Sequence, residues 1–326
     1  MTQLRFATLD PADVEYGRVD RVTPGIRRVI AENPSKFTYH GTGTYLVGHG
    51  DVVVIDPGPE LDSHREALRS ALAGERVRAI LVTHCHADHS PLASWLSAES
   101  GAPTYAFGPH PPLDVDDDDL DEDPGDHDDD DPAAEELLDG VKVEEAVDRS
   151  FVPDQAVGDG DVVVDGPGLT MTAVYTPGHT SNHLCFAFAE ERTLFTGDHV
   201  MGWSTTVVSP PDGDMAAYIA SLEKVAARDD EVLWPTHGPA RRDGPEYVRA
   251  LVEHRLERER QIVEQVRGGR HTIPEMVEQL YASVAPELHK AAGRSVLAHL
   301  VKLVDEGTVA VADGSRARLR SRYESV

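Results

Sequence analysis

Short apolar runs that end abruptly at turns or polar clusters constrain the fold of this 326-residue chain more than any other feature. The run DVVVID at 51–56 is rich in β-branched residues and is followed by a Pro-Gly-Pro turn, which is typical of a buried strand. A second such run, VRAILVT at 77–83, leads directly into a polar cluster. Between the two runs, leucines and alanines recur at helical spacing over 62–72. This alternation predicts an α/β protein whose strands carry polar groups at their ends.

The alternation continues along the rest of the chain. Further strands are expected at 161–165, 169–175, 183–189, 193–196 and 231–234. Further helices are expected from Ser90-Pro91 through Trp95, and at 215–227, 245–267, 274–283 and 293–306. Residues 307–314 contain two glycine turns and predict a small hairpin, which Arg316, Arg318, Arg320 and Arg322 follow as a basic tail.

Charge is spread unevenly along the chain. The 58 acidic and 30 basic side chains give a formal net charge of −28, and 13 of the 18 residues at 114–131 are Asp or Glu. Such a run repels itself and offers little to bury, so we expect a disordered acidic insertion over 113–139. Residues 241–326 are different, with 15 basic and 13 acidic side chains. We therefore expect one large domain at 1–243 and a separate C-terminal domain at 244–326.

Apolar patterning and cysteine usage predict the compartment. The apolar runs are far shorter than the ~20 residues that cross a bilayer, and the first residues lack a charged-then-apolar leader. The two cysteines, Cys85 and Cys185, are a hundred positions apart and indicate no disulfide framework. A cytoplasmic protein without membrane contact is expected.

The densest polar cluster is HCHADH at 84–89, directly after an expected strand. Residues two apart point the same way in an extended loop, so His84 and His86 can bind one cation while Cys85 faces elsewhere. Asp88 and His89 follow where the chain turns into a helix, and can face a second cation. Unpaired buried charges are costly, so an ordinary core role does not account for these residues.

Three further strand ends offer ligand-type side chains: His179 in TPGHT, Asp198 in TGDH and His237 in PTHG. A single histidine at a strand end is usually a surface or hydrogen-bonded residue, but each of these lies in a glycine-containing turn. Five imidazoles and two carboxylates suit two borderline cations such as Zn²⁺, with iron and manganese as alternatives. Asp198 can bridge the two ions.

These motifs together resemble the metallo-β-lactamase superfamily, whose pattern is HxHxDH followed by a distant His, a bridging Asp and a last His. Within it, NPSKFTYHGTGTYLVG near the start and LHKAAGRSVLAHLVKLVDEGTV near the end are similar to the lactamase-β-2 type of endoribonuclease-like hydrolases. The resemblance implies an αββα sandwich with metals at one edge of its sheets and a winged-helix-like C-terminal domain. It also implies one metal at His84, His86 and His179, a second at Asp88, His89 and His237, and Asp198 shared.

Several residues near these motifs are candidates for supporting roles. Asp56 and Thr83 stand at strand ends and are expected to orient metal ligands, although Asp56 can instead be a turn cap before Pro57. His199, Trp203, Thr205 and Thr206 follow the bridging aspartate and are expected to face the substrate. The alternatives are that His199 is a packed neighbour and Trp203 a core aromatic.

The expected activity is hydrolysis by a hydroxide that bridges two zinc ions, with Asp88 and Asp198 as catalytic ligands and Asp88 as a proton acceptor. The substrate stays open between single-stranded RNA and a small ester or thioester. A glyoxalase-II-like thioesterase is the main alternative, because that class shares all seven ligands. A non-catalytic, nucleic-acid-binding regulatory protein is a second alternative.

Related activities fit the residues less well. Zinc β-lactamases usually lack the aspartate at the position of Asp198, and diiron flavoproteins usually place Glu where His86 stands. Persulfide dioxygenases use fewer ligands. Residues 241–326 carry a net charge of only +2, which gives little attraction to a phosphate backbone. The C-terminal domain can therefore equally pack against the catalytic domain or against the second chain of a homodimer.

Overall fold

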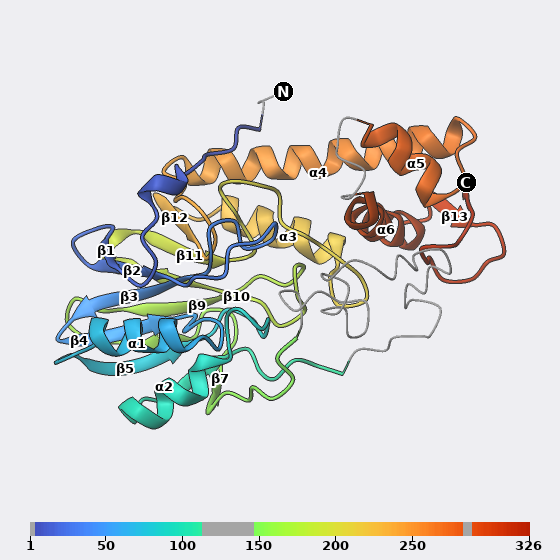
Figure 1. Cartoon of the computed structure of the whole chain (residues 1–326). Coiled ribbons are helices and arrows are strands. Elements are labelled where there is room, and N and C mark those ends of the chain that lie inside the picture. Colours follow the sequence, from blue (N-terminus) through green and yellow to red (C-terminus); the bar gives the residue numbers. More distant parts are fainter. Residues whose placement is uncertain (1–3, 113–146, 283–288) are drawn as a thin grey trace, which may run out of the picture.

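The computed structural model describes residues 4–112, 147–282 and 289–326 (Figure 1). The expected acidic insertion at 113–139 lies outside these residues, and its disorder stays a prediction.

The first sheet has seven strands in the order in which they occur along the chain. They are β1 (Val19–Arg21), β2 (Ile26–Ile30), β3 (Gly43–His49), β4 (Asp51–Ile55), β5 (Arg76–Leu81), β6 (Thr104–Ala106) and β7 (Gln155–Ala156). The first four pair antiparallel, whereas β4 to β7 run parallel. The strands expected at 51–56 and 77–83 are β4 and β5.

The second sheet has five strands in the order β12-β11-β10-β9-β8. They are β8 (Val162–Val164), β9 (Met171–Tyr175), β10 (Leu184–Phe188), β11 (Thr193–Gly197) and β12 (Val232–Pro235). Because β10 is antiparallel to β9 and β11, and β11 is parallel to β12, the strands β9, β11 and β12 run in one direction. Their carboxyl ends therefore lie at the same edge of the sheet.

The two sheets pack face to face, and helices cover both outer faces (Figure 1). The core between the sheets contains Val53, Leu81, Phe186, Phe195 and Trp234. Helices α1 (Asp62–Ala71) and α2 (Leu92–Ser100) pack on the first sheet, and α3 (Met215–Ala226) and α4 (Gly244–Arg267) pack on the second. Short 3₁₀ helices lie at Pro11–Asp13 and Ala189–Glu191. The expected αββα sandwich is confirmed.

The C-terminal part forms a smaller winged-helix unit. It contains α5 (Ile273–Leu280), α6 (His289–Asp305) and the antiparallel pair β13 (Val309–Val311) and β14 (Tyr323–Ser325). The expectation of a basic tail is wrong. The four arginines lie in the connection between the two wing strands, because Tyr323 pairs with Val311 and brings the chain back.

Helix α4 runs from the sandwich to the C-terminal helices (Figure 1) and contributes to two hydrophobic cores. Near its start, Tyr247, Val248 and Leu251 pack with α3 of the sandwich. Near its end, Ile262 and Val266 pack with α5 and α6. The single helix therefore contributes to both units, and the boundary near residue 243 stays a prediction.

Membrane-spanning helices and cysteines can be described for the residues that the structure covers. No helix among them is both long and apolar enough to cross a bilayer. Cys85 and Cys185 are free and buried, and burial raises the pKa of Cys85 to about 11 and that of Cys185 to about 12. The cytoplasmic location stays a prediction.

Candidate metal centre

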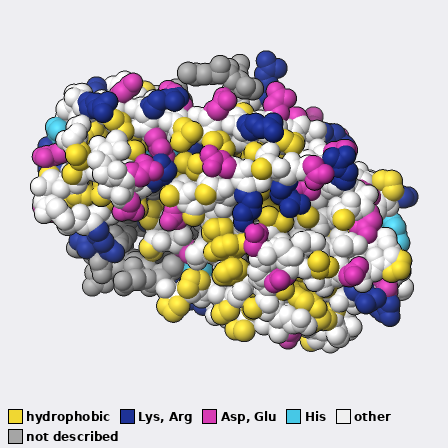
Figure 2. All heavy atoms as spheres, turned by 180° about the vertical axis from the view of Figure 1, so that it is seen from behind, with side chains coloured by type: hydrophobic (Ala, Val, Ile, Leu, Met, Phe, Trp, Pro, Cys, Tyr) yellow, Lys and Arg dark blue, Asp and Glu magenta, His cyan; other side chains and the backbone are white. Residues whose placement is uncertain are grey.

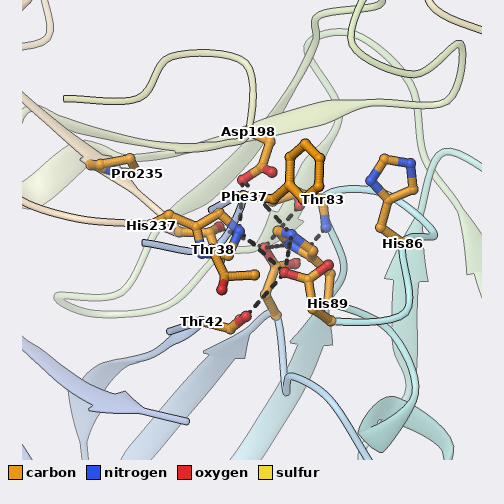
Figure 3. Close-up of polar contacts among 12 residues, drawn as sticks. Phe37, Thr38, Thr42, Thr83, His86, His89, Asp198, Pro235 and His237 are labelled. Carbon is orange, nitrogen blue, oxygen red and sulfur yellow. Dashed lines mark hydrogen bonds and ion pairs between the residues drawn. The ribbon is translucent and has the colours of Figure 1, made fainter. Parts of the chain in front are cut away.

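All seven expected ligands gather at one edge of the sandwich, because each follows a strand that ends there. His84, His86, Asp88 and His89 lie between β5 and α2. His179 follows β9, Asp198 follows β11 and His237 follows β12. Figure 3 shows His89, Asp198 and His237 pointing toward one another from separate elements.

The first ligand group contains three histidines. One ring nitrogen each of His84, His86 and His179 lies within 4.8 Å of the other two. The closest pair is His86 Nδ1 and His179 Nε2, which are 3.3 Å apart. This grouping is the one that the resemblance implied for one metal.

The second ligand group contains Asp88, His89 and His237, whose ligand atoms also lie within 4.8 Å of one another. Oδ2 of Asp88 is 3.1 Å from Nε2 of His237 and 3.3 Å from Nε2 of His89. This grouping matches the expected second metal.

Asp198 lies between the two groups. Its Oδ1 is 3.5 Å from Nε2 of His237 and 3.7 Å from Nε2 of His89, while its Oδ2 is 3.9 Å from Nε2 of His179. One carboxylate oxygen thus faces each group, which is the arrangement that a bridging ligand requires.

Unsatisfied polar atoms converge on this centre. Within the described part of the chain, Nε2 of His84, Nε2 of His89 and Oδ1 of Asp198 are buried without a hydrogen-bond partner. Buried polar atoms normally have partners, so orphaned imidazole nitrogens and a carboxylate oxygen that face one another fit a cation-binding site. The donor set fits two divalent metal ions.

The electrostatics of the first group favour neutral ligands. Burial, with the neighbouring imidazoles, holds the pKa of His84 well below its usual range, and burial lowers the pKa of His86 to about 3. Neutral imidazole is the form that binds metals, so these two rings are prepared for coordination at neutral pH.

The electrostatics of the second group favour a cation. Burial alone would lower the pKa of His237, but the carboxylates of Asp198 and Asp88 raise it to about 10. The same carboxylates, with Asp56, hold the pKa of His89 well above its usual range against the effect of burial. Positive charge is therefore strongly stabilised here, and a divalent metal ion bound by His89 and His237 would supply it in place of the imidazole protons.

Hydrogen bonds to the outer ring nitrogens turn the Nε2 atoms inward. Nδ1 of His89 lies 2.9 Å from Oδ2 of Asp56, and Nδ1 of His84 lies 3.0 Å from the hydroxyl of Thr83. Nδ1 of His179 is 2.7 Å from the carbonyl of Val207. Such contacts fix ring orientation at metal sites. Asp56 and Thr83 thus occupy the places expected of ligand-orienting residues.

Two supporting residues were not predicted. Nε2 of His183 accepts a hydrogen bond from the backbone N–H of Asp198 at 3.3 Å, and the Thr236 hydroxyl donates to Oδ2 of Asp56 at 3.0 Å. A signal for Thr236 exists in the sequence, because Thr236-His237 repeats the Thr83-His84 pair. His183 stands in TPGHTSNH, four residues after a ligand.

A pocket opens over the metal centre. Its lining combines ligands with apolar and polar side chains: Lys36, Phe37, Thr38, His86, Asp88, His179, Asp198, Met201, Trp203, Ser204, Val207 and His237. Tyr39 stacks on Trp203 with ring centroids 4.7 Å apart. Gly238 makes this contact possible, since a Cβ there would lie 2.7 Å from Cδ1 of Trp203.

The residues after Asp198 divide into two sets. Trp203 lines the pocket, as expected of a residue that faces substrate. His199 and Thr206 are buried and do not line it. The His199 ring packs 5.1 Å from Tyr218 and 5.9 Å from His183, which favours the alternative of a packed neighbour.

Comparison with known proteins assigns the class. A family model described as the metallo-β-lactamase superfamily matches residues 40–237, and one described as a β-lactamase associated winged helix domain matches residues 272–317. The chain therefore belongs to the metallo-β-lactamase superfamily, and it is a hydrolase of that class with the C-terminal winged helix that was expected.

Individual relatives extend this assignment over nearly the whole chain. A β-lactamase-like protein 2 homolog from Caenorhabditis elegans is 29% identical over 89% of this chain and 88% of its own length. An atrochrysone carboxyl ACP thioesterase from Aspergillus chevalieri is 30% identical over 90% of this chain and 85% of its own. The crystal structure of a β-lactamase domain protein from Burkholderia ambifaria covers 97% of this chain and 96% of its own, with 21% identity and a TM-score of 0.70, which shows the shared fold.

Proposed function

We propose that this chain is a dinuclear zinc hydrolase of acyl thioesters. The observation that carries the proposal is the pocket, which places an apolar wall of Phe37, Met201, Trp203 and Val207 beside the two ligand groups. An acyl chain suits such a wall, and a scissile carbonyl can then lie at the cluster. The thioesterase among the relatives supports the same substrate class.

RNA has weaker support as a substrate. The pocket wall is largely apolar, whereas RNA recognition relies on cationic and stacking contacts along a phosphate backbone. The chain carries a net charge of −28, which opposes a polyanion. On the face shown in Figure 2, basic side chains are interspersed with acidic ones rather than gathered in a band.

The expected homodimer stays a prediction.

The ligand assignment follows the two groups. His84, His86 and His179 would hold one zinc ion, Asp88, His89 and His237 the other, and Asp198 would contact both. When bound, two zinc ions polarise the scissile carbonyl and lower the pKa of the attacking water.

Asp88 is the side chain that we expect to accept a proton from the attacking water. The imidazoles of His89 and His237 hold the pKa of Asp88 well below its usual range, although burial acts in the opposite direction. Asp88 is therefore ionised at neutral pH and can accept a proton as water adds to the carbonyl carbon. The carbon–sulfur bond then breaks, and the proton held by Asp88 passes to the leaving thiolate. A thiol and a carboxylic acid are released, and the acid loses its remaining proton to solvent.

Substrate comparison tests this proposal. Purified protein is assayed on N-acetylcysteamine thioesters with aromatic and aliphatic acyl groups, on matched oxygen esters and on single-stranded RNA. We expect thioester hydrolysis that falls at least about a thousandfold in Asp198→Asn, since a bridging ligand supports the transition-state charge at both ions. Cleavage of RNA without thioester turnover would contradict the proposal.

A tryptophan pair tests the role of the apolar wall. Trp203→Ala should raise KM for aromatic acyl thioesters about tenfold, because stacking and buried area are lost from the pocket. Trp95→Ala is the matched control, because Trp95 packs under Arg65 and Arg69 on the surface of α2 and should leave KM unchanged. Equal KM values for the two variants would show that the apolar wall does not bind the acyl group.

A further inference from the structure

We infer that Arg255 of α4, the helix that connects the two units, is a positioning residue for the metal centre. The inference rests on the proposed function, because it concerns ligands of the proposed metal ions. It begins from the loop 199–208, which follows Asp198 and supplies Met201, Trp203, Ser204 and Val207 to the pocket.

Arg255 reaches this loop from outside the sandwich. The residue is 4% exposed, and its Nη2 donates a hydrogen bond to the carbonyl of Thr206 at 2.5 Å. Its guanidinium carbon lies 5.2 Å from the centroid of the Tyr218 ring, so an aromatic face of α3 also stabilises the cation.

Thr206 in turn contacts the backbone of Asp198, the residue that carries the proposed bridging carboxylate. Its hydroxyl donates to the carbonyl of Asp198 at 2.8 Å and lies 3.0 Å from the carbonyl of His199. The backbone of Asp198 is therefore fixed from both sides, since its N–H donates to His183.

The next residue along the loop, Val207, contacts His179, a ligand of the first group. The carbonyl of Val207 accepts a hydrogen bond from Nδ1 of His179 at 2.7 Å. Because Thr206 and Val207 share a planar peptide unit, fixing the carbonyl of Thr206 also restricts the residue that orients His179. Arg255 thus helps to position two proposed ligands, Asp198 and His179, through the segment 206–207.

Packing alone does not explain an arginine at this position. A buried guanidinium loses hydration, and an apolar side chain of similar length would fill the same space at lower cost. The cation is useful here because a loop carbonyl needs a donor. Other loop carbonyls are held in the same manner, by the Tyr247 hydroxyl at Met201 and the Ala7 N–H at Gly202. The loop is therefore clamped from several elements, and α4 supplies two of the donors.

The test measures metal binding rather than turnover alone. Apoprotein is titrated with Co²⁺, and the dissociation constants and visible d–d spectrum are compared between wild type and Arg255→Met. We expect binding at least about tenfold weaker and an altered spectrum, as for the loss of other outer contacts at metal sites. Arg249→Met is the matched control. Arg249 lies on the same helix and donates to the carbonyl of Ala226 at 3.3 Å, so its loss should change affinity less than twofold.

Thr206 supplies a second variant that leaves α4 intact. Thr206→Val should reproduce the weaker binding and altered spectrum, and Thr206→Ser, which restores the hydroxyl, should recover both. Arg255→Met combined with Thr206→Val should bind about as weakly as either single variant, because both act through one chain of contacts.

The outcomes separate this inference from the proposed function. If wild type binds two Co²⁺ and a folded Arg255→Met protein has the same affinity and spectrum, the inference alone is overturned. If Arg255→Met does not fold, wild-type affinity and spectrum in Thr206→Val overturn it. If wild type binds no Co²⁺, the proposed function fails and the inference fails with it.

Discussion

At the scale of single residues, the metal centre depends on a carboxylate that does not line the pocket. Asp56 is fully buried, and its Oδ2 contacts the hydroxyls of Thr83 and Thr236 and Nδ1 of His89 at 2.8 to 3.0 Å. Its backbone is left-handed, with φ of 48°, a conformation that costs about 1 kcal/mol or more outside glycine. One residue thus joins the ends of β4, β5 and β12 beneath the ligands.

Asp56→Asn should weaken zinc binding about tenfold to a hundredfold. An amide nitrogen cannot accept a hydrogen bond from His89 or the two hydroxyls, so at least one ligand loses its orientation. Competition with a chelator measures the affinity. Asp51→Ala at the exposed start of the same strand is the control, because its contacts with Arg76 and Arg78 are at the surface. Equal zinc affinity in Asp56→Asn and wild type would show that Asp56 is only a turn residue.

His64 makes the apoprotein sensitive to acid. The ring is 2% exposed, its Nε2 lies 2.8 Å from the Thr44 hydroxyl, and burial lowers its pKa to about 4. The unfolded chain takes up this proton near pH 6.5, whereas the folded chain does so only near pH 4. Folding stability should therefore fall as the pH drops from about 6.5 to about 4, by roughly 2–3 kcal/mol from this residue.

Chemical denaturation of the apoprotein across that pH window measures the effect. His254 and His299 also have pKa values lowered to about 4 by burial, so the informative quantity is the difference from His64→Gln. The variant should show a shallower loss of stability with acidification. Parallel curves for the two proteins would contradict the assignment to His64.

At the scale of elements, the loop that carries His179 is shaped by its contact with α3. Gly178 has φ of 137°, and a Cβ there would lie 2.3 Å from Cα of Tyr218. Backbone meets backbone at this point, and neither can yield by rotating a side chain. The close approach places His179 against the ligands that follow β5.

Gly178→Ala should therefore destabilise the fold by about 3 kcal/mol or more, from strain at φ and the clash with α3. Gly168→Ala is the matched control. Gly168 also has a positive φ, of 74°, but a Cβ there would meet nothing within 4 Å, so its cost should be about 1–2 kcal/mol. Denaturant unfolding and zinc content of both variants check the prediction. Equal losses of unfolding free energy in the two variants would show that the close approach of Gly178 to α3 does not affect stability.

At the scale of the whole molecule, sequence reasoning predicted the parts that are local. The strand ends and the ligand-type residues at them could be read directly, because each motif spans only a few residues beside a clear apolar run. β2 was not predicted, since Arg27 and Arg28 interrupt its apolar pattern. Arg28 is nevertheless buried and donates to the carbonyl of Gly238.

Features that join distant segments could not be predicted from local patterns. The stacking of Tyr39 on Trp203 and the pairing of β13 with β14 depend on how the chain returns after long connections. The same holds for Arg255, which in the sequence is one charge among many on an amphipathic helix. Only the packing of α4 against α3 shows that this charge faces inward.

The central claim is that one site, built from both sheets, hydrolyses thioesters with two metal ions. Titration of metal-free protein with Zn²⁺, followed by the rate of N-acetylcysteamine thioester hydrolysis, tests it most directly. We expect almost no activity without metal and a rate that reaches its plateau at two equivalents of Zn²⁺ per chain. Full activity in the metal-free protein, or a plateau at one equivalent, would contradict it.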